Sequence, residues 1–238
     1  MTLPVFALLA LVVTFAAFIQ GTTGVGFALI VAPVLAVLAP QLVPVCLLFL
    51  MIPLNSYVML RERTALDRDG AVWITLGRFA GTFGGLAILA ALSARNLNIA
   101  IGASTVLAAL LSYLAPSFAP GRAAFLTAGV VTGVTETATG IGGPPLALVY
   151  QHEPAPRLRS TIAFCFLVGE LVSLVVLAFA GRANARQFLA AIRLVPALAL
   201  GALLSRAVHE RVHGTLLRNF VLLFAIVSGS VLIIRVWK

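Results

Sequence analysis

The chain has 238 residues, of which 61% are apolar and only 10% are charged. A soluble domain usually carries about 25% charged residues, so this composition excludes an ordinary soluble protein and indicates an all-α polytopic membrane protein. The formal net charge is +9. Because the sequence has no basic run and no alternation of basic and aromatic residues, we interpret the arginines as loop residues that orient the spans, and not as a nucleic-acid surface.

The apolar segments predict helices that cross or partly cross the bilayer. No charged side chain precedes Arg61, and a helix of that length would cross the bilayer about three times. The N-terminus lacks the positive region of a secretory signal, so the first segment is expected to be retained. In chain order the predicted segments are residues 3–19, 25–38, 42–60, 71–92, 97–114, 123–135, 146–150, 160–180, 187–205 and 216–234. The connections 61–70, 93–96, 151–159, 181–186 and 206–214 are expected to be loops or turns, the first of them exposed.

Two stretches interrupt these segments with residues that a continuous helix tolerates poorly. Gly133–Leu148 contains four glycines, three threonines, one glutamate and two consecutive prolines, and both glycine and proline disfavour helix. A weaker copy at Gln20–Ala28 aligns after a shift of 116 residues, which places Gly24 on Gly140, Gly26 on Gly142 and Gln20 on Glu136. Open backbone survives in a membrane only against protein or a water-filled cavity. We therefore predict a binding site at the two breaks, the first of them at residues 20–26.

The two halves of the chain also match outside the breaks. A shift of 115 residues aligns Phe49 with Phe164, Asn55 with Glu170 and Arg78 with Arg193. We interpret this as an internal duplication into residues 1–116 and 117–238, with 115–122 as the boundary, although apolar sequences also align by chance. Five segments per half would make the halves inverted, and four would make them parallel. The distribution of loop arginines slightly favours inverted halves with both termini outside, which is a common transporter plan.

Six polar side chains lie in or beside apolar segments, where a central charge costs about 2.5–3.5 kcal/mol. They are Gln20, Asn55, Arg78, Glu136, Glu170 and Arg193. One interpretation is a set of buried ion pairs that only hold the helices in register. The other is a polar central cavity, in which both arginines face the centre and attract an anion while a carboxylate takes up or releases a proton.

The segments that follow the breaks begin at glycines. Free amides at a helix N-terminus suit anionic oxygens, and the threonines beside the breaks add hydroxyl donors. The competing interpretation is that these small residues only permit close helix contact. With the six side chains above, the predicted substrate-binding set is completed by Thr22, Thr23, Gly24, Gly26, Thr137, Thr139, Gly140, Gly142 and Gly143.

The sequence carries no catalytic or metal-binding constellation. Cys46 and Cys165 lie in apolar segments, and we interpret them as small buried hydrophobic residues. His152, His209 and His213 lie in predicted loops, where no cysteine or carboxylate partner completes a zinc site. We therefore expect neither an enzyme nor a cofactor or a metal site.

Two motifs carry a resemblance to a known family. They are F-I-Q-G-T-T-G-V-G-F at residues 18–27 and V-T-G-V-T-E-T-A-T-G-I-G-G-P-P-L at residues 131–146. With the duplicated layout and the chain length, they resemble the sulfite exporter TauE/SafE family over the whole chain. The resemblance implies an inner-membrane permease for sulfite, sulfonates or other small organosulfur or carboxylate anions. Some members have G-x-G-G-G at the second break, where this chain has G-I-G-G-P-P.

These features favour a multi-pass secondary transporter of the cell inner membrane whose partners are a small anion and the lipid bilayer. Glu136, beside the second break, is the expected site of proton coupling. The alternative is a non-transporting scaffold or assembly subunit, for which two interrupted helices and inward charges have little use. The absence of an ATP-binding motif argues against a primary pump. Substrate, direction, coupling ion and homo-oligomer formation stay open.

Overall fold

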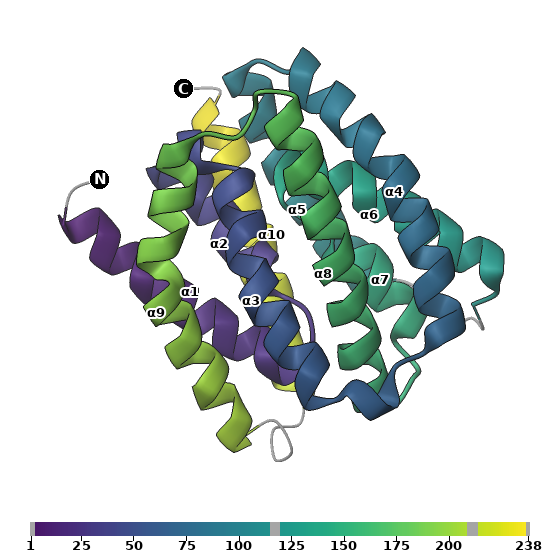
Figure 1. Ribbon diagram of the computed structural model, residues 1–238. Helices are drawn as coiled ribbons and strands as arrows, with labels where there is room; N and C mark the ends of the chain where they lie inside the picture. The colour runs from purple at the N-terminus through teal and green to yellow at the C-terminus, as the bar shows by residue number, and fades with distance from the viewer. Residues whose placement is uncertain (1–2, 115–119, 209–213, 237–238) are drawn as a thin grey trace.

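A computed structural model describes residues 3–114, 120–208 and 214–236. Figure 1 shows that these residues fold into a bundle of helices, and the described part contains no β-strand. The helices are α1 (Leu3–Thr23), α2 (Phe27–Leu38), α3 (Val45–Arg61), α4 (Arg68–Ala91), α5 (Ala94–Leu114), α6 (Arg122–Thr139), α7 (Gly143–Tyr150), α8 (Ala155–Phe179), α9 (Ala185–Val208) and α10 (Gly214–Val236). Two 3₁₀ turns, Pro40–Leu42 and Arg63–Ala65, connect α2 to α3 and α3 to α4.

Four of these helices, α1, α4, α8 and α9, are long and apolar enough to cross a membrane. Shorter apolar helices occur in α2, α3, α5 and α10. Many large apolar side chains point outward, for example Leu11, Phe79 and Leu200, as expected where lipid replaces water. The predicted all-α polytopic class is confirmed.

Both breaks depend on glycines with a left-handed backbone. Gly24 and Gly26 have φ angles of 89° and 122°, and Gly140 has a φ angle of 81°, values that residues with a side chain rarely adopt. The Gly140 amide donates to the Glu136 carbonyl at 2.7 Å and closes the last turn of α6, which is a usual end for a helix.

The helix boundaries at both breaks differ from the sequence prediction. α1 runs through Gln20 to Thr23, so the first break covers residues 24–26 and not 20–26. The Thr22 and Thr23 hydroxyls donate back to carbonyls one turn earlier, at 2.8 and 2.9 Å, so these polar side chains find partners inside the helix. α7 begins at residue 143 and not at 146, because consecutive prolines are tolerated in a first turn, where amides have no helical partner.

Close packing between α4 and α6 uses glycines on both helices. Built Cβ atoms on Gly77 and Gly81 of α4 would overlap backbone carbonyls of α6, and those on Gly129 and Gly133 of α6 would overlap backbone atoms of α4. Small residues let two backbones approach in this way inside a membrane. This contact fixes the position of the inner residues of α4 relative to the second break.

The ion pairs in the connections define one end of the bundle. Arg122 at the start of α6 pairs with Asp69 at the start of α4 at 3.7 Å. Arg157 at the start of α8 pairs with Asp67, which caps α4, at 3.3 Å. Hence α4, α6 and α8 all begin at this end, which we call the charged end. The opposite end, where α8 finishes and α9 begins, is called the α8–α9 end.

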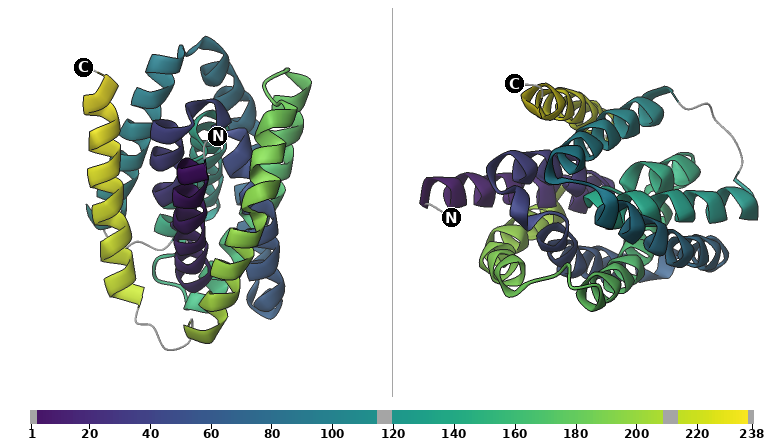
Figure 2. Two further views of the ribbon diagram at one scale, coloured as in Figure 1. Left: turned by 90° about the vertical axis from the view of Figure 1, so that its left-hand side faces the viewer. Right: turned by 90° about the horizontal axis from the view of Figure 1, so that it is seen from above.

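The helix contacts repeat when α1–α5 are exchanged for α6–α10. α1 packs against α9 as α6 packs against α4, α1 contacts α2 as α6 contacts α7, and α3 and α5 pack against their own counterparts α8 and α10. α1 runs parallel to α9, because Thr14 contacts Ala197 and Gly21 contacts Ser205. α1 therefore begins at the α8–α9 end, whereas α6 begins at the charged end. Figures 1 and 2 show the chain termini toward the same side of the bundle.

Candidate functional site

A chain of buried polar side chains begins at the first break. The amide of Phe27, the first residue of α2, donates to Gln20 Oε1 at 3.1 Å. Gln20 Nε2 donates to Asn55 Oδ1 at 2.8 Å, and Asn55 Nδ2 donates to Glu170 Oε1 at 2.7 Å. The three side chains are at most 1% exposed. The chain joins α1, α3 and α8 in the middle of the bundle, so the structure brings together three of the residues predicted from the sequence.

The Asn55–Glu170 hydrogen bond joins two positions that the 115-residue shift aligns with each other. Equivalent positions touch each other where a two-fold axis passes between them. The same holds for the packing of α3 on α8. This hydrogen bond therefore marks the centre around which the repeated contacts are arranged.

A buried ion pair lies at the second break. Arg78 of α4 donates to Glu136 of α6, and the two side chains are 1% and 0% exposed. The Arg78 guanidinium also lies over the ring of Phe166, 5.2 Å from its centroid, in a cation–π contact. A Cβ on Gly169 would overlap the guanidinium. The glycine next to Glu170 on α8 is therefore what lets Arg78 reach this position.

Four polar atoms of this centre lack a hydrogen-bond partner within the described residues. They are Arg78 Nε and Nη1, Glu136 Oε1 and Glu170 Oε2. A buried polar atom without a partner costs about 1–3 kcal/mol. The centre contains two carboxylates and one guanidinium, so it has donors free for an anion and acceptors free for a proton.

The backbone of the second break packs closely against Glu136. Thr132 Oγ1 donates to the Gly142 carbonyl at 3.1 Å, which ties the break to α6. A Cβ on Gly142 would lie 2.9 Å from carbons of both Glu136 and Thr132, so only glycine fits here. On the next turn of α6, Thr137 shares a hydrogen bond of 2.8 Å with Ser173 of α8. Sequence reasoning missed Ser173, because a lone serine in an apolar segment carries no signal.

A cavity of about 360 Å³ lies between the two breaks and the charged end. It contains three of the predicted residues, Thr22, Thr23 and Gly143, and its walls are mostly apolar. The lining is completed by Val25, Leu29, Pro144, Ala147, Leu148, Gln151, Ala155, Leu158, Asn219, Val221 and Leu222. A Cβ on Gly143 would lie 3.9 Å from both Val25 and the Phe166 ring. Since Arg78 lies over that ring, Phe166 lies close both to the cavity wall at Gly143 and to the ion pair.

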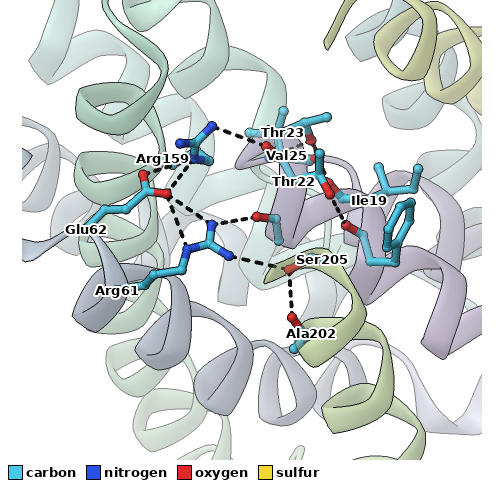
Figure 3. Close-up of polar contacts among 11 residues, drawn as sticks. Ile19, Thr22, Thr23, Val25, Arg61, Glu62, Arg159, Ala202 and Ser205 are labelled. Carbon is cyan, nitrogen blue, oxygen red and sulfur yellow. Dashed lines mark hydrogen bonds and ion pairs between the residues drawn. The ribbon is translucent and has the colours of Figure 1, made fainter. Parts of the chain in front are cut away.

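An arginine cluster holds the end of α1 beside this cavity (Figure 3). Arg159 Nε donates to Glu62 at 2.8 Å, and Arg159 Nη1 donates to the Thr22 carbonyl at 3.3 Å. Arg61 Nη2 donates to the Gly21 carbonyl at 2.6 Å. The last carbonyls of a helix carry partial negative charge, so two cations stabilise this end of α1.

This cluster corrects the expectation that Arg61 and Arg159 lie in loops and that Glu62, in the connection after α3, is exposed. Arg61 is the last residue of α3, and Arg159 lies inside α8, which begins at residue 155. The side chains of Glu62 and Arg159 are only 10% and 8% exposed. Charge cancellation along a connecting segment does not distinguish exposed pairs from pairs that are packed against a helix end.

The prediction that Arg193 faces the centre is wrong. Arg193 is exposed on the outer surface of α9, although its aligned counterpart Arg78 is buried. The buried residues of α9 near it are Ala191 and Leu194, so one hydrophobic stripe faces inward and the arginine falls beside it. A shift that aligns two arginines does not ensure that both helices present the same face.

The threonine hydroxyls beside the breaks are used inside their own helices. Thr22 and Thr23 donate to Phe18 and Ile19, and Thr139 donates to Thr135. Thr139 Oγ1 also accepts from the Ile141 amide at 3.3 Å within the second break. In this structure these hydroxyls shape the breaks and are not free donors.

The other predicted features are simpler to place. Cys46 and Cys165 are buried free thiols, as interpreted. His152 is exposed, and His209 and His213 lie outside the described residues. Among the residues described, no three His, Cys, Asp or Glu side chains come together as a metal site.

The comparison with known proteins identifies the family. The profile described as Sulfite exporter TauE/SafE matches residues 9–232, nearly the full chain. Comparison with curated proteins and with solved structures found no match. The family comprises membrane permeases that export sulfite and other anions, and its members are transporters rather than enzymes. The chain therefore belongs to the sulfite exporter TauE/SafE family, as a multi-pass membrane protein built around two interrupted helix pairs.

Proposed function

We propose that the chain is a secondary transporter that moves a small anion across the cell inner membrane, coupled to protons. Sulfite, a sulfonate or another organosulfur or carboxylate anion is the proposed substrate. The observation that carries this proposal is the buried Arg78–Glu136 ion pair at the second break. In that pair a guanidinium is held by an internal carboxylate that an external anion can replace.

The replacement explains how anion and proton are linked. A guanidinium binds a carboxylate, a sulfite or a sulfonate through the same fork of N–H donors. Two negative charges about 4 Å apart repel by roughly 4 kcal/mol at an effective dielectric constant near 20. Glu136 therefore takes up a proton when the anion occupies Arg78. Because protonation and binding are then linked, anion affinity rises as the pH falls.

Glu170 completes the charge balance of the centre. One guanidinium neutralises one carboxylate, and Glu136 has that partner in this structure. Among the described residues, the one hydrogen-bond donor to Glu170 is the neutral amide of Asn55. A negative charge without a cationic partner is energetically costly inside the membrane. Glu170 is therefore assigned as protonated while Arg78 and Glu136 are paired.

The cavity supplies the route to this centre. It lies at the charged end, and Phe166 lies close both to its wall at Gly143 and to Arg78. Gly143 begins α7 at the cavity wall, where the positive end of the helix dipole attracts an anion. Under the positive-inside rule the charged end faces the cytoplasm, so movement of Phe166 admits an anion from that side.

We also propose that residues 1–116 and 117–238 are inverted repeats. The exchange of helix contacts between the halves and the opposite starting ends of α1 and α6 support this arrangement. Such halves alternate access by rocking around a central site. A reporter fused after Lys238 should report the outside, and one inserted at Asp67 should report the cytoplasm. Reporters on the same side would contradict inversion.

The function is tested by uptake into proteoliposomes. Labelled sulfite, sulfoacetate and a simple carboxylate are offered with and without a pH gradient. We expect uptake of at least one of them, stimulated by the gradient, and the same uptake by the control variant Arg63→Gln, which changes an exposed arginine. No uptake of any of these anions by folded protein would favour the scaffold alternative.

A further inference from the structure

Two exposed arginines share one face of α9. Arg186 and Arg193 are both exposed, and they are seven residues apart, which is two helical turns or about 10 Å along the axis. Leu189, one turn from each, is 54% exposed on the same face. The face is therefore a cationic stripe that begins at the α8–α9 end and extends into the span.

Arg193 lies well inside an apolar span, which runs from Ala185 to Ala207. A charged side chain facing hydrocarbon is costly, so it reaches for the membrane surface or for a partner. Side chains on a helix lean toward its N-terminus, which directs Arg193 toward Arg186. Pro196 has no amide hydrogen, so the backbone carbonyl of the exposed Ile192 lacks its helical hydrogen-bond donor. This carbonyl is an additional hydrogen-bond acceptor on the same face.

No residue of the described chain satisfies these two cations. Neither Arg186 nor Arg193 has an ion pair or a hydrogen bond to another described residue. The exposed carboxylate Asp69 and the half-buried Glu153 lie at the charged end, across the bundle. The partner must therefore be an anion from outside the described chain.

The surroundings of the stripe favour a lipid over a second copy of the chain. Helix contacts between membrane proteins favour small residues, whereas Leu189, Ile192 and Leu200 are bulky and more than half exposed. Among the described residues, a second copy has no exposed carboxylate at this depth to offer. A phospholipid brings a phosphate at the surface and acyl chains that cover the leucines.

We propose that Arg186 and Arg193 bind the headgroup phosphate of an anionic phospholipid in the leaflet at the α8–α9 end. Arg186 holds the phosphate at the surface, and Arg193 reaches it from inside the span. This site lies outside the transport centre and does not depend on the proposed function.

The test counts bound lipid by native mass spectrometry. Protein in detergent is titrated with phosphatidylglycerol or with phosphatidylcholine. Wild type should bind phosphatidylglycerol more tightly than phosphatidylcholine. Arg193→Gln and Arg186→Gln should each weaken phosphatidylglycerol binding about fivefold, which is the effect of losing one cation near the surface. Arg63→Gln, which removes an exposed arginine at the charged end, is the matched control and should bind as wild type does.

Three results would overturn the proposal. They are equal binding of the two lipids by wild type, unchanged phosphatidylglycerol binding by both α9 variants, and a dimer that Arg193→Gln dissociates without changing lipid binding. If Arg193→Gln fails to fold, Arg193→Lys and Arg186→Gln answer the question. The first keeps a charge and should retain most of the binding, and the second should weaken it about fivefold.

Discussion

The two breaks occupy equivalent places in the fold but have different chemistry. At the first break Gln20 is neutral, and it both accepts from the Phe27 amide and donates to Asn55. At the second break the aligned residue is Glu136, which is charged and paired with Arg78. The counterpart of α4 beside the first break is α9, but its arginine, Arg193, faces outward and does not pair with Gln20.

This difference indicates that the two breaks have the same helix arrangement but different roles. The first break satisfies its own helix N-terminus with a side chain of the same half, so it needs no ligand. The second break retains unpaired donors on Arg78 and an unpaired acceptor on Glu136. In the proposed mechanism the anion binds at the second break, and the first break has a structural role.

The largest expected effect comes from removing the buried cation. Arg78→Gln leaves Glu136 buried without its partner, which costs about 3–5 kcal/mol of stability, and removes the proposed anion ligand. We expect anion uptake by the folded fraction to fall at least about 100-fold, or about 2.7 kcal/mol. Arg193→Gln should reduce uptake far less, because that side chain is exposed. Equal losses in the two variants would remove the distinction between the halves.

The double variant Arg78→Gln/Glu136→Gln separates folding from transport. Two neutral amides then replace the ion pair and leave no unpaired buried charge, so thermal stability should recover from that of Arg78→Gln toward that of wild type. Uptake should stay lost. Recovered uptake would show that Arg78 only holds helices in register.

The next largest effect comes from filling the second break. Gly142→Leu places a side chain where Glu136 and Thr132 lie, so it should abolish substrate binding measured by isothermal calorimetry. Gly121→Leu is the matched control, because no atom lies within 4 Å of a Cβ at that position. If both leucine variants bound anion alike, the break would not be part of the site.

An intermediate effect is expected from Phe166, which lies close to both the cavity wall and Arg78. Phe166→Leu removes the cation–π contact and opens space beside Arg78, so anion exchange without a pH gradient should rise several-fold over wild type. The cation–π contact itself contributes about 1–2 kcal/mol when desolvated. Phe188→Leu, at a ring that packs on Phe49 away from the ion pair, should leave exchange unchanged. A lower exchange rate in Phe166→Leu would assign the ring to substrate binding instead.

The smallest effect on transport is expected at the first break. Gln20→Leu leaves the Phe27 amide and Asn55 Oδ1 without partners, which costs about 1–3 kcal/mol of stability for each group. Uptake per folded molecule should fall less than about tenfold, with its dependence on the pH gradient unchanged. Loss of gradient dependence in this variant would make the first break an equal part of the proton path.

The sequence predicted those parts of the fold that follow from composition and from strong local signals. Apolar length gave the helices, and the glycines and prolines near residues 24 and 140 gave both breaks. Polar side chains inside apolar segments identified Gln20, Asn55, Arg78, Glu136 and Glu170, because burial of such groups requires partners. All five lie buried at the centre.

The remaining features depend on which way each helix faces. Arg193 and Arg78 occupy the same place in the alignment, and a small rotation of a helix decides whether such a residue is buried. Arg159 was expected in a loop and Glu62 on the surface, because a charged segment gives no sign that Arg159 binds a helix end or that it pairs with Glu62. Phe166 has no signal at all, since a phenylalanine in an apolar helix is typical whether or not it touches a cation.

The central claim is that Glu136 holds Arg78 until a proton and an anion replace it. It is tested most directly by comparing Glu136→Gln with wild type in proteoliposomes, measuring anion exchange and gradient-driven uptake of the same labelled substrate. We predict that the variant still exchanges anion, with an affinity that no longer rises as the pH falls, and that a pH gradient no longer stimulates its uptake. Gradient-stimulated uptake equal to that of wild type would contradict this account.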